Sequence, residues 1–211
     1  SSRSPRSPTA LSTKRVRTPE KFRGARPGIS APGDIPLWML FPLFFAAVYL
    51  SHLTLLRLPY FWDEGGYYIP AAWDFFRTGT LIPVTTVTNA HPPLPSILLA
   101  AWWHLSGFVV SGTRTLVCIV AAAALLGVYK LARSLTSNAV AAVVTILTAI
   151  YPVWFAQSTL AHADIFAAAF TLWGLAIYLD PAADPPAQTT LLRSRILAAI
   201  LFSLPPLSKA T

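Results

Sequence analysis

The sequence predicts an all-α protein, a polytopic bundle of membrane helices, from two features of its composition. Hydrophobic residues make up 55% of the 211 residues and charged residues only 11%, whereas soluble domains carry about 25% charged residues. The apolar residues also gather in long runs, which is the pattern of helices that cross a bilayer. The single cysteine, Cys118, excludes a disulfide framework within the chain.

The first element is a basic tail over residues 1–35. It holds eight of the sixteen Lys and Arg residues against two acids, and it is rich in Ser and Pro without apolar periodicity. We expect this tail to be disordered and to lie in the cytoplasm, because positively charged flanks of membrane spans stay inside. Since the basicity resides largely in the tail, it indicates anionic lipid at the bilayer surface and not nucleic acid.

Five spans are predicted within residues 36–211. Their approximate limits are 37–56, 115–132, 139–156, 165–179 and 195–208. A further apolar run, Leu94–Trp103, is too short for a span. If it crossed the membrane, Lys130 and Arg133 would lie outside, against the positive-inside rule. Residues 57–113 are therefore predicted to form one external loop that contains juxtamembrane helices.

This topology brings the rare ionisable residues of the apolar part to the external face of the membrane. They are Asp63, Glu64, His91, Asp164 and Lys209. Ionisable residues in an apolar membrane chain are expensive to keep and usually functional. We therefore take this group as the candidate site.

Asp63 and Glu64 stand directly after the first predicted span, in the run Phe61-Trp-Asp-Glu-Gly-Gly-Tyr-Tyr68. The two glycines let the backbone turn or approach a ligand closely. Two interpretations stay open for this pair. It is either a functional pair of carboxylates or a solvated loop pair beside an aromatic belt.

His91 precedes two prolines, which can begin a helix. It would then lie near a helix N-terminus, where partial positive charge and free N–H groups suit a phosphate. An ordinary loop histidine is the alternative.

Asp164 lies between two apolar runs, where an acid is either functional or a helix N-cap. Lys209 follows the last apolar run and either binds a phosphate or extends to the membrane interface. The residues alone do not separate these alternatives.

Taken in order, these motifs resemble the polyprenyl-phosphate-sugar-dependent glycosyltransferases of the GT-C fold, in particular the protein O-mannosyltransferase and aminoarabinose transferase group. The resemblance rests on the Asp-Glu pair after the first span, the His91-Pro-Pro-Leu segment before a juxtamembrane helix, and Asp164 at the external start of a later span. Where the aminoarabinose transferases carry Glu-Lys-Pro, this chain has Ala90-His91-Pro92, closer to the mannosyltransferase pattern. The resemblance covers about residues 36–211, which would be the N-terminal part of the GT-C transmembrane module.

The resemblance implies transfer of a glycosyl group, a mannosyl-like hexosyl or a pentosyl, from a polyprenyl-phosphate-linked sugar to an acceptor hydroxyl on a protein, lipid or glycan. The reaction would invert the anomeric centre at the periplasmic or external face of a bacterial inner or plasma membrane. Asp63 would be the general base, and Glu64 would orient the acceptor or hold Asp63 in place. The expected substrate-binding residues are Tyr67, His91, Asp164 and Lys209. No nucleotide is expected, and the resemblance leaves open whether a divalent metal takes part.

Two alternatives without an enzymatic activity stay open. The carboxylates could line an ion path in a transporter or flippase, or the chain could be a membrane scaffold. The predicted external position of the carboxylates favours the enzyme, because transporter sites usually lie near mid-membrane. The chain lacks an initial Met and ends directly after an apolar run, so we expect a fragment that is inactive alone.

Overall fold

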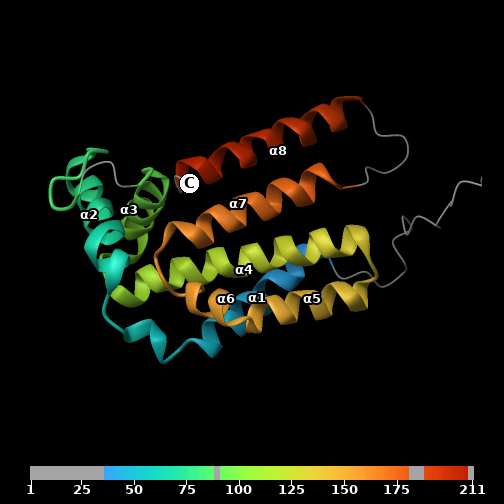
Figure 1. Cartoon of the computed structure of the whole chain (residues 1–211), viewed down its shortest axis with the longest axis horizontal. Coiled ribbons are helices and arrows are strands. Elements are labelled where there is room, and N and C mark those ends of the chain that lie inside the picture. Colours follow the sequence, from blue (N-terminus) through green and yellow to red (C-terminus); the bar gives the residue numbers. More distant parts are fainter. Residues whose placement is uncertain (1–35, 88–90, 181–187, 209–211) are drawn as a thin grey trace, which may run out of the picture.

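The computed structural model of the protein describes residues 36–87, 91–180 and 188–208 (Figure 1). Within these ranges the chain forms helices and no β-strand, so the predicted all-α class is confirmed. The α-helices are α1 (Leu37–Ser51), α2 (Ile69–Thr78), α3 (Leu94–Ser106), α4 (Val110–Leu135), α5 (Asn138–Ile150), α6 (Pro152–Gln157), α7 (Ala163–Tyr178) and α8 (Gln188–Ser208). A 3-10 turn, η1 (Leu55–Arg57), and a π-helical turn, η2 (Glu64–Tyr68), lie between α1 and α2. The predicted tail, residues 1–35, and Lys209 lie outside the described residues.

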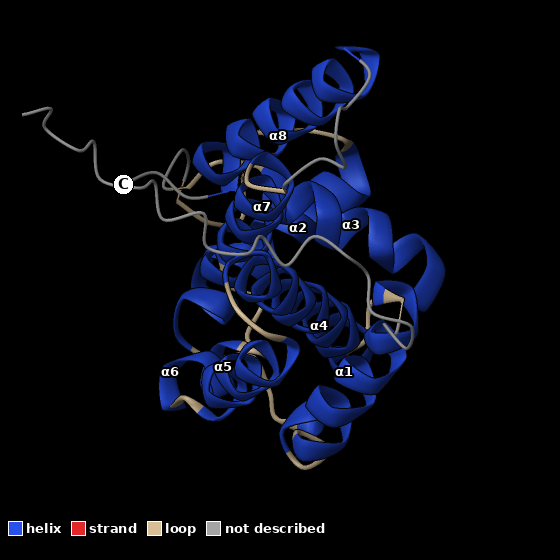
Figure 2. Cartoon of the chain, turned by 90° about the vertical axis from the view of Figure 1, so that its right-hand side faces the viewer, coloured by secondary structure: helices blue, strands red, loops and turns tan. Residues whose placement is uncertain are grey.

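Helix α4 is the centre of the bundle. The helices α1, α5 and α7 pack against it, and α8 packs against α7 (Figures 1 and 2). The pair α2 and α3 lies at the end of the bundle where α4 and α7 begin, and α3 contacts α4 and α8 (Figure 1). This end of the bundle carries most of the ionisable residues singled out from the sequence.

Small residues let the neighbouring helices approach α4 closely. Its fully buried positions include Val117, Cys118, Ala121, Ala122 and Ala124. Short side chains of this kind bring helix backbones together. A Cβ atom added at Gly127 would lie 3.2 Å from the Cβ atom of Leu172 on α7. One turn earlier, the Trp173 indole N–H donates to the Ala123 carbonyl oxygen over 2.8 Å.

A buried histidine joins the end of α1 to α6. The Nε2 atom of His52 lies 2.8 Å from the Phe155 carbonyl oxygen, and the two rings stack with centroids 3.9 Å apart. The Nδ1 atom of His52 lies 2.7 Å from the Val48 carbonyl oxygen within α1. The end of α1 is thereby tied to a segment about a hundred positions later in the chain.

Two described helices are long and apolar enough to cross a membrane, namely α4 and the Leu191–Ser208 part of α8. The helices α1, α5 and α7 are apolar but shorter. The first helix ends at Ser51, before the predicted limit of the first span, because a 3-10 turn follows it. Helix α4 begins earlier than predicted, at Val110, and so includes a polar first part. The number of spans stays a prediction.

Replacing Gly127 by Leu should lower the free energy of unfolding by about 1–3 kcal/mol, the usual cost of overfilling a packed interior. The measurement is thermal unfolding of the purified protein in detergent micelles. Ala139→Leu is the matched control, because Ala139 is exposed on α5. Equal stability of the two variants would contradict the close approach of α4 and α7.

Candidate active site

In the segment before α2, the adjacent carboxylates of Asp63 and Glu64 lie in different environments, one exposed and one buried. Trp62 has a φ of 51°, in the left-handed region that bulky residues rarely adopt, and its side chain is 85% exposed. The π-helical turn η2 begins two residues later. Asp63 is exposed, whereas Glu64 is fully buried. Of the two carboxylates, only Asp63 is therefore accessible to a substrate.

Glu64 forms a buried ion pair with Arg114 of α4. The Nη2 atom of Arg114 lies 3.1 Å from Glu64 Oε2, and the Nη1 atom lies 3.3 Å from Oε1. The backbone N–H of Ala161 donates to Oε1 over 2.9 Å. The two side chains are 0% and 1% exposed. This pair joins the segment before α2, the start of α4 and the segment before α7.

The remaining donors of Arg114 are also occupied. Its guanidinium donates to the carbonyl oxygens of Leu58 at 3.0 Å, Pro59 at 3.1 Å and Thr159 at 2.7 Å. Such complete pairing offsets the cost of removing two charges from water. Of the two roles predicted for Glu64, its burial favours holding Asp63 in place over contact with an acceptor.

Arg114 was missed in the sequence analysis. The available signal was a single arginine close to the start of a long apolar run, where an unpaired charge would be expensive. The argument that ionisable residues in an apolar membrane chain are usually functional therefore applies to Arg114 as well as to the acidic residues. Its partner could not be read from the sequence, because Glu64 stands 50 positions earlier.

Four aromatic rings form a cluster of mutual contacts, namely those of Tyr67, Tyr68, His91 and His162. The His91 ring stacks on Tyr68 with centroids 4.9 Å apart and meets the edge of Tyr67 at 4.8 Å. The His162 ring lies 5.7 Å from Tyr68. The sequence analysis missed Tyr68 and His162, because nothing in the local sequence distinguishes them from the aromatic residues and histidines around them.

Tyr67 holds the backbone of His91 in place. Its hydroxyl donates to the His91 carbonyl oxygen over 3.0 Å and accepts from the His91 backbone N–H over 3.2 Å. The Tyr67 side chain is buried. In this arrangement Tyr67 positions His91, the residue predicted to bind a phosphate.

Tyr68 is the residue on which the two predicted carboxylates act together. Burial raises the pKa of the Tyr68 hydroxyl to about 12, opposed by a backbone hydrogen bond at Ala163 and reinforced by the negative charges of Asp164 and Asp63. Asp63 and Asp164 stand 101 positions apart in the sequence. The fold nevertheless brings both carboxylates close enough to affect one phenol, which stays protonated at any physiological pH.

The starts of α3 and α7 supply the other two predicted residues. His91 precedes the first residue of α3, Leu94, by three positions, in agreement with the expected helix start. Helix α7 begins at Ala163 after the cap residue His162, so Asp164 lies in the first turn. The alternative in which Asp164 is the N-cap residue is therefore wrong. Asp164 is half-buried and sits where the positive end of the helix favours a carboxylate.

A comparison with protein families matches residues 90–211 to the family described as dolichyl-phosphate-mannose-protein mannosyltransferase. The chain belongs to this family. The matched part includes His91, Arg114 and Asp164, whereas Asp63 precedes it. No curated protein and no solved structure matches the chain. Membership confirms the predicted resemblance, and with two apolar helices of sufficient length it makes the chain a membrane glycosyltransferase.

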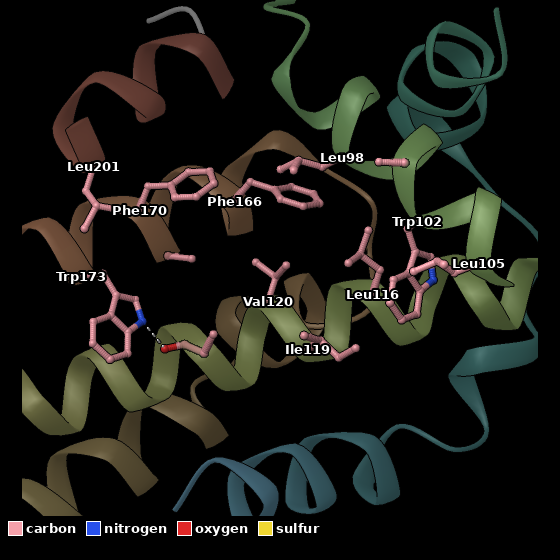
Figure 3. A pocket seen from close by; sticks show the side chains of 13 residues that line it. Leu98, Trp102, Leu105, Leu116, Ile119, Val120, Phe166, Phe170, Trp173 and Leu201 are labelled. Atoms are coloured by element: carbon pink, nitrogen blue, oxygen red, sulfur yellow. Dashed lines mark hydrogen bonds between the residues drawn. The ribbon is translucent and has the colours of Figure 1, made fainter. Parts of the chain in front are cut away.

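An apolar groove of about 510 Å³ runs between α3, α4, α7 and α8 of this mannosyltransferase-family chain. Figure 3 shows Phe166 and Phe170 of α7 across from Val120 of α4, with Leu201 of α8 near one end and Leu105 of α3 near the other. All of the described lining residues are apolar or aromatic. The groove is lined by side chains from residues 98–105 of α3, 116–123 of α4 and 166–173 of α7, together with Leu201 of α8.

Whether a divalent metal takes part was left open by the sequence, and residues 36–87, 91–180 and 188–208 contain no preformed ligand set for one. No three His, Cys, Asp or Glu side chains come together there in a way that could hold a metal ion. Lys209, the other residue predicted to bind a phosphate, lies outside these ranges. Helix α8 ends at Ser208, at the end of the bundle where α2 and α3 stand (Figure 1).

Asp74 of α2 holds the loop that follows this helix. Its Oδ2 atom accepts hydrogen bonds from the backbone N–H groups of Val84 and Thr85, at 2.7 and 2.8 Å, and from the Thr85 hydroxyl at 2.9 Å. Burial raises the pKa of Asp74, but these hydrogen bonds and the positive charge of Arg77 outweigh it. The pKa of this carboxyl is therefore lowered from its ordinary value of 3.8.

Replacing Arg114 by Leu should lower the free energy of unfolding by about 3–5 kcal/mol, because it leaves Glu64 buried without its partner. Thermal unfolding in detergent micelles measures the effect. Arg77→Leu is the matched control, since Arg77 is exposed. The double variant Glu64→Gln with Arg114→Leu should recover part of the loss, and no recovery would contradict a specific pair.

Removing the Asp74 carboxylate should loosen residues 79–87. A carboxyl with a lowered folded-state pKa stabilises the fold in full above its unfolded value, about 3.8, and loses that contribution as the pH falls through the folded value. At neutral pH, Asp74→Ala should therefore speed hydrogen exchange at the Val84 and Thr85 amides about ten- to a hundredfold. Mass spectrometry reads the exchange, with Asp180→Ala as control because Asp180 is half-exposed and pairs with Lys130. Equal exchange in both variants would overturn this assignment.

Proposed function

We propose that this chain carries the catalytic centre of a glycosyltransferase that moves a hexosyl, mannosyl-like group from a polyprenyl-phosphate-linked sugar to an acceptor hydroxyl. Asp63 is the general base, and the reaction inverts the anomeric centre. The family supports the class of reaction. The observation that carries the assignment of the site is the convergence of Asp63, Asp164 and His91 around the ring of Tyr68.

In the proposed reaction, Asp63 accepts the proton of the acceptor hydroxyl while the hydroxyl oxygen forms a bond to the anomeric carbon of the sugar. The bond from that carbon to the phosphate oxygen breaks, and its electron pair leaves with the polyprenyl phosphate. A single displacement of this kind inverts the carbon. The exposure of Asp63 supports its role, because a general base has to reach within hydrogen-bond distance of the hydroxyl.

The departing phosphate gains negative charge, which N–H donors aimed at it stabilise. His91 before the start of α3 is the proposed donor within the described residues, and Lys209 is proposed to add a positive charge. Asp164 would accept hydrogen bonds from the hydroxyls of the sugar or the acceptor. Glu64 and Arg114 take no part in proton transfer and hold the backbone on both sides of the site.

The apolar groove between α3, α4, α7 and α8 is the proposed binding place of the prenyl chain. It is lined by hydrocarbon and aromatic side chains, and on α7 its lining begins at Phe166, two positions after Asp164. A prenyl chain offers no hydrogen bonds, so burial of its apolar surface has to supply its affinity. The groove matches that requirement.

The proposed topology has five spans with the N-terminus in the cytoplasm and the site on the external face. The starts of α4 and α7 and the end of α8 lie together at one end of the bundle (Figure 1). The last part of α4, which carries Lys130 and Arg133, lies at the opposite end (Figure 1). This separation supports the prediction, because basic residues are retained on the cytoplasmic side.

Asp63→Asn should lower kcat by about 10²–10⁴-fold, the usual contribution of a general base, and leave donor binding unchanged. The measurement is transfer of radiolabelled mannose from polyprenyl-phosphate mannose to an acceptor, in membranes that contain the full-length protein. Asp180→Asn makes the same chemical change at a half-exposed carboxylate at the end of α7 away from the site. Its rate should equal that of the wild type.

A wild-type rate in Asp63→Asn would contradict the proposed base. Loss of both transfer and donor binding in that variant would assign Asp63 to binding instead. Loss of transfer in the Asp180→Asn control as well would show that the effect does not depend on the site.

A further inference from the structure

A second, smaller cavity lies between α2, the loop that follows it and the start of α3. We call it the α2–α3 pocket, and its volume is about 190 Å³. Its lining residues are Tyr67, Ala71, Phe75, Thr80, Leu81, Ile82, Pro83, His91, Pro93 and Ser96. The pocket shares Tyr67 and His91 with the candidate active site but contains neither of the carboxylates Asp63 and Asp164.

One wall of the pocket is formed by the loop after α2, residues 79–87, and hydrogen bonds fix the position of this loop. The Asp74 carboxylate fixes the backbone of Val84 and Thr85, and the Thr86 hydroxyl donates to the Gly66 carbonyl oxygen over 2.6 Å. Within the loop, the Thr80 hydroxyl donates to the Ile82 carbonyl oxygen over 3.2 Å. These bonds give the residues that line the pocket a defined position before any ligand binds, which lowers the entropic cost of binding.

Two polar side chains of the pocket have hydrogen-bonding capacity to spare. Ser96 is 93% buried, since its exposed fraction is 7%. Within the described part of the chain, neither its hydroxyl nor the imidazole of His91 has a hydrogen-bond partner. Both side chains are therefore open to hydrogen bonds with a ligand in the pocket.

The rest of the lining decides what kind of ligand fits. Among the described lining residues none has a formal charge at neutral pH when histidine is neutral. The remaining described lining residues are apolar or aromatic, including Tyr67 and Phe75, except for Thr80, whose hydroxyl donates to the Ile82 carbonyl oxygen within the loop. A neutral group with apolar faces and hydroxyl edges matches this surface, which is the chemistry of a monosaccharide ring. A phosphate does not match it, because the described lining residues include no Lys or Arg.

The geometry points to the α2–α3 pocket as the subsite for the sugar ring of the lipid-linked donor, with Ser96 and the held loop 79–87 as residues that determine which sugar is accepted. This inference rests on the proposed function. It uses the position of His91, which faces the pocket and would also contact the phosphate one bond away from the ring. The pocket is smaller than the ~300–1,000 Å³ of typical drug-sized ligand sites, so it admits one ring and not a disaccharide.

The experiment compares the binding of two lipids to the purified full-length protein in nanodiscs. The probes are a polyprenyl monophosphate and the same lipid that carries mannose, followed by the quenching of tryptophan fluorescence. Wild-type protein should bind the mannosyl lipid about tenfold more tightly than the bare phosphate. Ser96→Val removes the hydroxyl and fills the pocket with two methyl groups, so it should make the two affinities equal by weakening only the mannosyl lipid.

Ser96→Ala removes the hydroxyl without filling the pocket, and it should weaken the mannosyl lipid about three- to tenfold, the loss expected for one hydrogen bond. Ser111→Val is the matched control, because Ser111 is exposed in the first turn of α4. It should leave both affinities unchanged. Unchanged binding of the bare phosphate by Ser96→Val shows in the same assay that this variant is folded.

The outcomes separate the inference from the proposed function. Equal binding of the two lipids by the wild type would overturn the sugar subsite while the proposed donor stands. An unchanged preference in Ser96→Val would overturn it as well, and so would an equal loss for both lipids. If the wild type binds neither lipid, the proposed function fails and the subsite fails with it.

Discussion

The buried ion pair between Glu64 and Arg114 is the interaction on which the rest of this structure depends. Two charges enclosed at this depth are tolerated only if each has a full set of partners. The requirement is met by backbone groups from two further segments, 58–59 and 159–161. The pair therefore fixes three separate parts of the chain relative to one another. The starts of α4 and α7 and the turn before α2 cannot shift independently while it is intact.

Because of this constraint, the neighbouring carboxylates of Asp63 and Glu64 differ in their exposure to solvent. Once Glu64 is held inside, the helical geometry of the π turn leaves Asp63 at the surface. The same fixed frame brings Asp63 and Asp164 within electrostatic reach of the Tyr68 hydroxyl. The strained φ of Trp62 marks the place where the chain has to bend to achieve this. Fixed surroundings of this kind are what a proton acceptor needs, because misplacement by an ångström lowers a rate steeply.

Much of the helical architecture could be predicted, because apolar runs dictate buried helices whatever their neighbours are. The placement of Asp63, His91 and Asp164 on one face of the membrane was predicted from the charge asymmetry of the loops, and it stays a prediction. The division between Asp63 and Glu64 could not be predicted, since adjacent carboxylates look equivalent until a distant arginine selects one of them. The early start of α4 was hidden for the same reason, because its polar first turns are stabilised by contacts with segments far away in sequence. The α2–α3 pocket depends on a loop that Asp74 fixes through hydrogen bonds to the backbone of Val84 and Thr85. No local sequence pattern predicts these hydrogen bonds.

The order of synthesis gives the ion pair a further consequence. A ribosome releases Glu64 first, Arg114 fifty residues later, and the Ala161 amide that completes the carboxylate last. Until residues 159–161 have emerged, Glu64 and Arg114 lack part of their enclosure. A chain synthesised only as far as residue 158 therefore has to keep both charges in contact with water, because the backbone groups of Thr159 and Ala161 that replace the water are not yet present.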